Sequence, residues 1–446
     1  MNKSTNKMGV IPLTFLTAIN MMGSGIIMLP AKLAQVGTMS VLSWLVTALG
    51  SVALAYSFAQ CGMNTRKGGG MGGYAEYSFG KSGAFMTNYT YGVSLLIANA
   101  AIAISVVGYA SVFFGVQLSP VPVALWTIFV LWLATVLNFW GAKFTGRLGS
   151  ITIWGVIIPV LLLGTVGWFW FKPALYVSSW NPNHLPLFSG IGQSITITLW
   201  AFLGLESACA NMDAVENPKR NVPIAVLGGT LGVGLIYILS TSVMQGIVPN
   251  SALLNSNAPF GLTFATLFGP AVGRIIIALM VISCFGSLFA WQFTIAEVFR
   301  SSSVEGYFPK IFEKVTQKET PVVGMVIITA VQTILSLMTI SPTLNNQFIT
   351  LVNLAVVTNL IPYLLSMAAL NVIQKSSDVT DSKIKSSTIV AFVASIYSLY
   401  ACYASGSEAM LYGGVVTFAG WTLYGFISKR FDLKKAEENK EKILSD

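Results

Sequence analysis

The chain has 446 residues, of which 54% are hydrophobic and only 9% are charged. Because an average soluble domain has about 25% charged residues, this composition excludes a soluble protein and predicts a multi-spanning membrane protein. The apolar runs have the length of membrane helices and lack the alternation of barrel strands, so we expect an all-α bundle. The net charge of +9 reflects basic residues in the loops of such a protein and does not indicate nucleic-acid binding.

Charges, prolines and glycine clusters divide the chain into about twelve predicted spans. Their approximate limits are 10–30, 38–60, 84–113, 122–140, 149–171, 190–211, 222–248, 259–299, 322–340, 347–371, 386–404 and 408–428. The third and eighth are long enough to be strongly tilted or to project from the bilayer. The first span has no cleavage site, so we expect it to be retained. The mixed-charge segment 429–446 predicts a solvated, partly disordered tail.

The basic residues indicate how the bundle is oriented. If the N-terminus is cytoplasmic, 22 of the 25 Lys and Arg residues lie in cytoplasmic segments, and only Lys32, Lys172 and Arg274 lie outside. The positive-inside rule therefore places both termini in the cytoplasm. His184 is the only histidine and falls in an outside loop, so any proton coupling has to use carboxylates or water.

The first span contains Gly23-Ser24-Gly25 near its middle. Small residues of this kind often serve helix packing in membranes. They also permit a break in the helix, which frees backbone amides to receive a carboxylate. We favour a break, because span six also carries a signal for interruption. Two breaks five spans apart are typical of two inverted five-span repeats with the substrate between them, here about 10–171 and 190–371.

The signal in span six is Glu206, the only acidic residue near the centre of a predicted span. A charge at that depth costs at least ~2.5 to 3.5 kcal/mol, so a use is expected. An ionised Glu206 would attract an ammonium group, whereas a protonated one would be a structural carboxyl. On a continuous helix Trp200 and Glu206 would point ~120° apart. A break at Gly204 would let both side chains face one cavity.

Aromatic and polar residues in other spans are candidates for the walls of that cavity. Trp200 and Trp291 lie several residues inside their spans, where their rings could hold an ammonium or an aliphatic stem. Alternatively, the two tryptophans belong to the aromatic belt at the membrane surface. Tyr91, Leu95 and Asn99 share one helix face at intervals of four residues, which is weaker evidence for a pocket wall.

Three further residues, Cys61, Tyr307 and Tyr424, lie near predicted cytoplasmic ends. They are candidates for a substrate pathway, although ordinary interfacial roles explain them as well.

Sequence motifs of enzymes and cofactor sites are missing. The four cysteines lack metal-ligand spacing, and the glycine-rich segment 66–74 lacks the ending of a phosphate-binding loop. No protease or hydrolase signature occurs. We therefore expect no metal, no cofactor and no enzymatic activity. A cation-selective channel is the alternative of a different class, but its continuous polar path is not evident in the spans.

Five motifs identify a family resemblance. They are Asn20-Met-Met-Gly-Ser-Gly-Ile26, the loop ending in Gly-Gly-Tyr74, Trp200-Ala-Phe-Leu-Gly-Leu-Glu-Ser-Ala208, Glu216-Asn-Pro-Lys-Arg-Asn-Val-Pro223 and Glu305-Gly-Tyr-Phe-Pro309. In this order they resemble the basic amino acid and polyamine antiporters of the amino acid/polyamine/organocation superfamily, over nearly the whole chain. The resemblance implies one transporter domain in the bacterial inner membrane, with a five-plus-five inverted repeat and two extra spans at about 386–428.

The resemblance also implies roles for single residues. The Gly23-Ser24-Gly25 break would meet an amino acid carboxylate, and Trp200 and Trp291 would enclose the aliphatic part of the substrate. Glu206 would serve the cationic end or the gate, and Tyr91 would close the site toward one side.

The implied substrates are a diamine and its parent amino acid. Span three reads Ser94-Leu95-Leu96 where arginine/agmatine relatives carry cysteine and tryptophan, which favours a simple amine over a guanidinium. We expect exchange of cytoplasmic putrescine for external ornithine, with putrescine uptake, with or without a proton, as a second mode. A lysine/cadaverine pair is the alternative. Membrane lipid surrounds the protein, and the oligomeric state, a homodimer included, is left open by the sequence.

Overall fold

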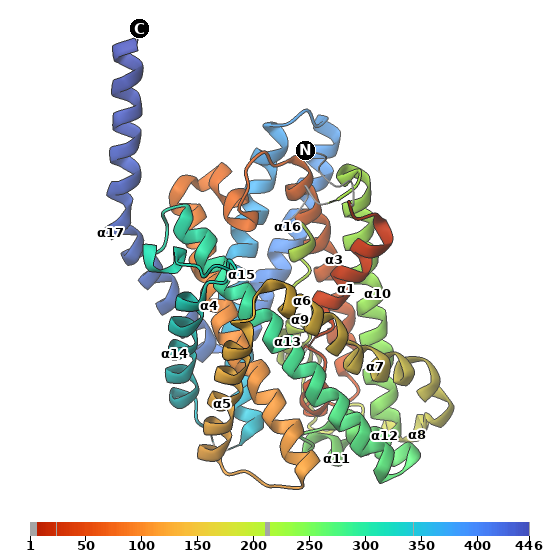
Figure 1. Cartoon of the computed structure of the whole chain (residues 1–446). Coiled ribbons are helices and arrows are strands. Elements are labelled where there is room, and N and C mark those ends of the chain that lie inside the picture. The colour runs from red at the N-terminus through yellow and green to blue at the C-terminus, as the bar shows by residue number, and fades with distance from the viewer. Residues whose placement is uncertain (1–6, 24, 210–214, 342, 446) are drawn as a thin grey trace.

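The computed structural model describes residues 7–23, 25–209, 215–341 and 343–445. Within these ranges the protein is a bundle of helices and contains no β-strand. The described part of the chain begins and ends at the same end of the bundle, and the C-terminal helix α17 projects beyond it (Figure 1). The short helices α8 and α11 lie at the opposite end (Figure 1).

The first half of the chain forms the following elements: α1 (Val10–Met21), α2 (Leu29–Leu33), α3 (Ser40–Asn64), α4 (Gly70–Phe114), α5 (Pro120–Asn138), α6 (Ala142–Thr152), α7 (Trp154–Val166), η1 (Gly167–Trp170) and α8 (Pro173–Ser178). The second half forms α9 (Leu187–Trp200), η2 (Ser207–Cys209), α10 (Pro218–Ile247), α11 (Asn250–Leu254), α12 (Pro259–Phe268), α13 (Pro270–Val304), η4 (Lys310–Glu313), α14 (Val322–Met338), α15 (Leu344–Lys375), α16 (Asp381–Ala404) and α17 (Ser407–Ser445).

The number of spans agrees with the sequence. Among the described residues, nine helical segments are long and apolar enough to cross a membrane, with α6, α7 and η1 counted as one segment. The pair α1 and α2, the pair α9 and η2, and the apolar helix α14 supply the remaining spans of a twelve-span transporter.

Two predictions were wrong, one about the extent of a span and one about the C-terminal tail. Segment 259–299 is not one long span, because Gly269 adopts a φ of +91° and separates α12 from α13. Pro270 then starts α13, as expected for a residue without a backbone N–H at a helix N-terminus. The tail after residue 429 is also helical to Ser445, where we expected partial disorder.

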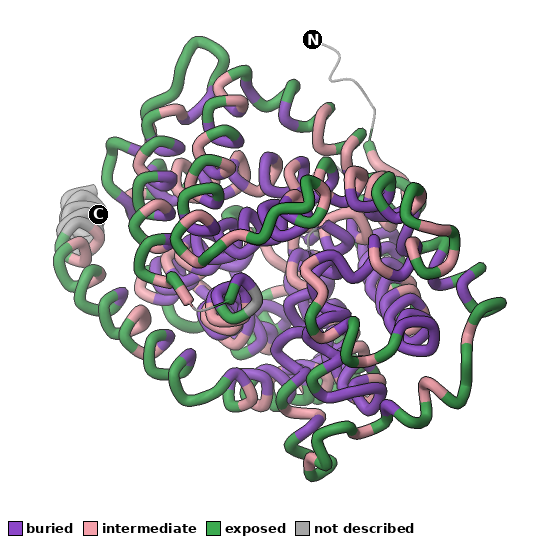
Figure 2. The backbone as a smooth tube through the Cα atoms, turned by 90° about the horizontal axis from the view of Figure 1, so that it is seen from below, coloured by how far each residue is buried: buried purple, intermediate pink, exposed green. Residues whose placement is uncertain are grey.

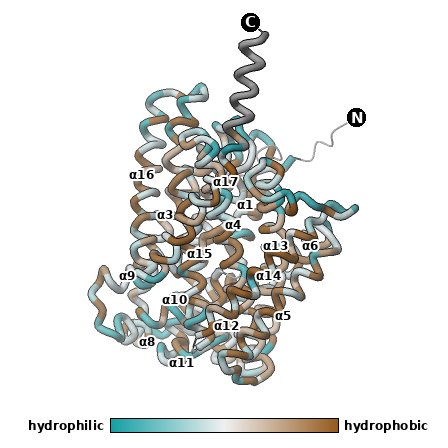
Figure 3. The backbone as a smooth tube through the Cα atoms, turned by 90° about the vertical axis from the view of Figure 1, so that its left-hand side faces the viewer, coloured by the Kyte–Doolittle hydropathy of each residue, from teal (hydrophilic) through white to brown (hydrophobic). Residues whose placement is uncertain are grey.

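The outside of the bundle has the chemistry of a lipid-facing surface. Large apolar side chains are exposed around its circumference, including Leu49 at 75%, Phe418 at 75% and Phe426 at 79%. Figure 2 shows exposed residues on the peripheral helices and buried residues inside. Hydrophobic residues line the helices along their length, and hydrophilic ones gather toward the ends and loops (Figure 3). This distribution fits a protein that crosses a bilayer.

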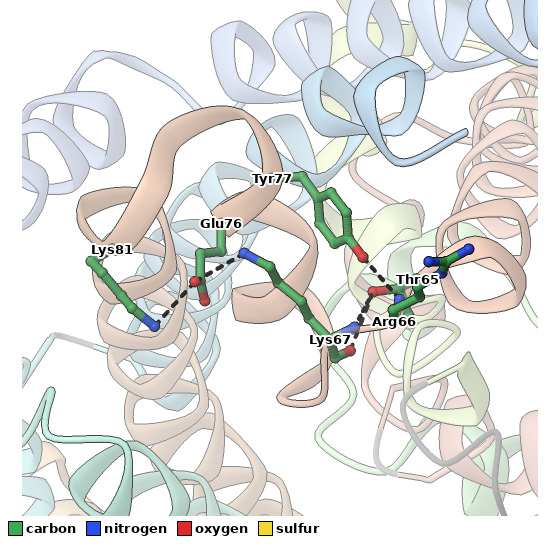
Figure 4. A network of polar contacts seen from close by, with 6 residues as sticks. All are labelled: Thr65, Arg66, Lys67, Glu76, Tyr77 and Lys81. Carbon is green, nitrogen blue, oxygen red and sulfur yellow. Dashed lines mark hydrogen bonds and ion pairs between the residues drawn. The ribbon is translucent and has the colours of Figure 1, made fainter. Parts of the chain in front are cut away.

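The glycine-rich segment is an irregular connection that runs into the start of α4, and ion pairs hold it in place. Glu76 Oε1 lies 2.9 Å from Lys67 Nζ and 3.0 Å from Lys81 Nζ (Figure 4). The backbone N–H of Arg66 donates to the Tyr77 hydroxyl at 2.9 Å. The helix that begins at Gly70 is kinked at Gly80, which has a φ of +62°. This loop therefore leads the chain into the membrane-spanning part of α4.

Candidate functional site

The predicted break in span one lies between α1 and α2. Helix α1 ends at Met21 and α2 begins at Leu29, with no helix in the described residues between them; Ser24 lies outside the described ranges. Two tyrosine hydroxyls donate to backbone carbonyls at this break, Tyr237 to Met21 O and Tyr109 to Ile27 O, each at 2.9 Å. Since unsatisfied backbone groups are costly inside a membrane, these bonds stabilise the interruption.

The second break is in span six. Helix α9 ends at Trp200, four residues before the glycine at which we expected the break. Gly204 itself has a φ of +104°, and a Cβ there would lie only 2.8 Å from Asn20 O. Glycine therefore serves both the backbone angle and the close approach of α1. Asn20 Nδ2 also donates to Ser207 Oγ at 2.6 Å, which ties the two breaks together.

The carboxylate of Glu206 lies between these breaks and the helices α4 and α15. Its side chain is 5% exposed. Tyr91 of α4 donates to Oε1 at 3.1 Å, the backbone N–H of Gly204 donates to Oε2 at 3.1 Å, and Tyr363 of α15 donates to Oε2. No Lys or Arg of the described chain forms an ion pair with it. A buried carboxylate with three donors and no counter-cation can accept an ammonium ligand.

Side chains around Glu206 enclose a cavity of about 50 Å³. Its lining includes seven of the eight predicted site residues, namely Gly23, Gly25, Tyr91, Asn99, Trp200, Glu206 and Trp291. Such a volume holds roughly three water molecules. Trp200 and Trp291 thus face the pocket rather than the membrane surface. The structure brings the residues together; their roles toward a ligand stay predictions.

Three buried polar atoms in the lining have no hydrogen-bond partner in the described part of the chain. They are Asn99 Oδ1, Asn359 Oδ1 and Trp200 Nε1. The two amide oxygens can accept from an ammonium, and the indole N–H can donate to a carboxylate. Buried polar groups are normally satisfied, so these atoms are candidates for contacts with the polar groups of a ligand.

A network of polar side chains holds the amide nitrogen of Asn99. Asn99 Nδ2 donates to Gln292 Oε1 at 2.8 Å. Gln292 Nε2 in turn lies within hydrogen-bond distance of Gln332 Oε1, Thr329 Oγ1 and Thr135 Oγ1, at 2.7, 2.9 and 3.1 Å. These side chains belong to α4, α5, α13 and α14, and together they fix the orientation of the Asn99 amide.

Two residues of α15 that line the cavity or contact Glu206 were not predicted from the sequence. Asn359 lines the cavity, and Tyr363, one helical turn later, donates to Glu206. Both are neutral, so a search for charges inside spans does not find them. Their spacing of four residues in the predicted span 347–371 places them on one helix face, which is the signal that could have identified them.

The three pathway candidates lie away from this cavity. Cys61 is buried in α3, where its Sγ donates to Ser366 O at 3.7 Å. Tyr307 and Tyr424 both pack on Phe85, with ring centroids 6.5 and 5.4 Å from it. Burial and the neighbouring acidic side chains raise the pKa of the Tyr307 hydroxyl. None of the three lines the cavity, so a pathway role for them stays a prediction.

Replacing Trp200 with leucine is expected to weaken substrate affinity while protein levels stay normal. The loss of a cation–π contact of ~0.5 to 2 kcal/mol corresponds to an increase in half-saturation concentration of about 2- to 30-fold. Trp126→Leu is the matched control, because Trp126 is 52% exposed on the outer surface of α5. Uptake kinetics of both variants test the expectation, and an unchanged half-saturation for Trp200→Leu would contradict the role of its ring.

Known proteins resemble this chain over nearly its whole length. Residues 8–421 match the family model for amino acid permeases. The chain is 67% identical over 435 residues to the putrescine transporter PotE of Haemophilus influenzae, covering 98% of this chain and 100% of that protein. It is 68% identical over 430 residues to the putrescine transporter PotE of Escherichia coli K12, covering 96% and 98% of the two chains.

A more distant relative is the cadaverine/lysine antiporter of Escherichia coli K12, which is 34% identical over 368 residues, or 81% of this chain and 83% of the relative. The family model and the high-identity relatives extend over nearly the whole bundle, including both broken spans and Glu206. The chain therefore belongs to the amino acid permease family of membrane transporters.

Proposed function

We propose that this protein is a secondary transporter that exchanges cytoplasmic putrescine for external ornithine, with uptake of putrescine, with or without a proton, as a second mode. The observation that carries the proposal is Glu206, a buried carboxylate that receives three hydrogen-bond donors and has no counter-cation among the described residues. It faces a cavity between two broken helices, where aromatic rings flank the space for an aliphatic chain.

The polar groups of the cavity fit a ligand with two ends. Glu206 binds one ammonium, and the unpaired oxygens of Asn99 and Asn359 accept from the second. Asn359 lies one turn, ~6 Å along the axis, from the tyrosine that holds Glu206, a distance that a four-carbon chain can span. Ornithine has the same carbon chain between its amines and adds a carboxylate, which meets free amides at the first break and Trp200 Nε1.

The relatives support the choice of substrate. The two proteins that are 67 and 68% identical are named putrescine transporters. The cadaverine/lysine antiporter is only 34% identical, so the lysine/cadaverine pair is the second candidate. In this proposal the protein lies in the bacterial inner membrane with both termini in the cytoplasm, and segments 10–171 and 190–371 are the two inverted repeats.

The proposed exchange moves charge across the membrane. Putrescine carries two positive charges and ornithine carries one, so each cycle moves one net positive charge outward. An inside-negative potential opposes this movement by ~2.3 kcal/mol per 100 mV. To balance this free energy, the combined concentration ratios of the two substrates across the membrane must favour exchange by roughly 50-fold. Exchange therefore requires steep opposed gradients, as when ornithine is decarboxylated inside the cell.

Counterflow in proteoliposomes tests the proposal. Vesicles loaded with labelled putrescine are expected to release it when unlabelled external ornithine is added, and release should saturate with ornithine concentration. Making the lumen more positive by 100 mV should favour release, since the cycle moves charge outward. Release that does not depend on external substrate would indicate a channel instead. Release driven by lysine but not by ornithine would favour the second candidate pair.

A further inference from the structure

A second cavity, of about 960 Å³, lies at the end of the bundle opposite the termini. Helix α11 and the loop between α4 and α5 contribute to its wall, and α11 marks that end in Figure 1. Its polar lining side chains include the amides of Gln35, Gln117, Asn255, Asn257 and Asn346, and Lys32 is the only ionisable side chain among the described lining residues.

Lys32 is an unusual lysine. It is 2% exposed and lies in the last turn of the short helix α2. Within the described ranges its ammonium forms no ion pair or hydrogen bond, not even with the carbonyls at the end of its own helix. Lysines are rarely buried without a partner, because an unpaired ammonium loses its hydration. Its place in the cavity lining points to a partner supplied from outside the protein.

The sequence offers no acidic residue for this purpose. There is no Asp or Glu before Glu76, and none between Glu76 and Glu206. In the predicted outside loops and at the helix ends that flank them, the only acidic residue is Glu408, which is exposed at the start of α17 and absent from the cavity lining. The wall therefore holds a basic group and no acidic one, which is unexpected in front of a site for dications.

The large cavity and the central cavity both border on α4, at different heights along the helix. Ile102 of this helix lines the central cavity, and Ser111 lines the large one. Nine residues of helix separate them by ~14 Å. Lys32 likewise follows Gly25 of the central site by only seven residues. The large cavity with Lys32 therefore lies between this end of the bundle and the central site.

We propose that Lys32 forms an outer binding site for the α-carboxylate of the amino acid entering from outside, and that it disfavours diamines there. The inference rests on the exchange proposed above and adds a step that sorts the two substrates before they reach the central site. Ornithine brings a carboxylate that pairs with the ammonium, whereas putrescine brings only like charges. A like charge facing the wrong substrate is a recognised source of specificity.

Uptake by right-side-out membrane vesicles loaded with putrescine tests this site. In Lys32→Gln the KM for external L-ornithine is expected to rise about tenfold, the loss of one hydrogen bond between charged groups. The KM for external putrescine should stay unchanged or fall. L-Ornithine methyl ester, which lacks the carboxylate, should be taken up equally by wild type and variant. Lys32→Arg should retain most of the preference for ornithine.

Matched controls distinguish a carboxylate-binding lysine from a structural one and from a site for an inorganic anion. Lys172→Gln removes an exposed charge from the same end of the protein and should leave both KM values unchanged. Equal loss for ornithine and putrescine in Lys32→Gln at normal protein level would overturn the proposal, since it would indicate a structural lysine. Replacing chloride by gluconate should not affect the wild type; an effect that mimics Lys32→Gln would assign the lysine to an inorganic anion and overturn the proposal too.

The outcome also distinguishes the outer site from the exchange itself. If wild-type vesicles take up no ornithine, the proposed exchange fails. If they take up ornithine with a KM that Lys32→Gln does not change, only the inference about Lys32 fails. Exchange of putrescine for putrescine in the same vesicles shows that the variant protein is folded and competent.

Discussion

Replacing Glu206 with glutamine is expected to abolish most putrescine transport without preventing insertion into the membrane. The amide keeps the size of the side chain, but it removes the negative charge that pairs with the ligand's ammonium. Loss of one partner of a buried charge pair costs ~2 to 5 kcal/mol, which corresponds to about 30-fold or more in substrate affinity. Counterflow of labelled putrescine in proteoliposomes measures this loss.

Glu297→Gln provides the control for a change of charge outside the cavity. Glu297 forms an ion pair with Arg300 at 2.8 Å, three residues later on α13, and it does not line the cavity. This variant should transport putrescine at close to the wild-type rate. Wild-type uptake by Glu206→Gln would remove this carboxylate from substrate binding.

Gly204→Ala is expected to reduce both the amount of folded protein and its transport activity severely. The residue has a φ of +104°, and a methyl group would lie 2.8 Å from Asn20 O. The backbone angle alone costs ~1 to 3 kcal/mol for a residue with a Cβ. The second break would have to move away from α1, which would also displace the N–H that donates to Glu206. Protein level in membranes and counterflow are the two measurements.

Gly228→Ala is the matched control. Gly228 lies in α10, and nothing is within 4 Å of the position that its Cβ would take. An alanine in a helix costs less than a glycine, so this variant should be at least as abundant as the wild type. If Gly204→Ala retained full activity at normal level, the backbone at the second break would tolerate a different conformation.

Local signals in the sequence were sufficient to predict the broken spans. A glycine pair around Ser24 and a glycine next to the only mid-span carboxylate both indicate backbone that leaves the helix. The spacing of Tyr91 and Asn99 placed them on one helix face, and the structure turns that face toward the cavity. These predictions depend on residues close together in the chain, where helix geometry decides which side chains are neighbours.

Partners from distant segments could not be predicted in the same way. Nothing near Glu206 in the sequence indicates that a tyrosine 157 residues later donates to it. The contact depends on how α15 packs against the second break, which no local pattern specifies. The division of segment 259–299, in contrast, could have been predicted. Gly269-Pro270 is a recognised signal for a helix boundary and is visible in the sequence.

The network around Gln292 and the second break give the two ends of the central cavity different backbone support. Side chains of four helices fasten the Asn99 end, whereas Glu206 is carried by a segment that has left its helix. A ligand bound as proposed would connect Asn99, which is carried by a helix, to Glu206, which is carried by a non-helical segment, and the length of its carbon chain would set the distance between them. Putrescine and ornithine have the same chain between their amines, so either one would hold the segment of Glu206 in the same position in both halves of the exchange cycle.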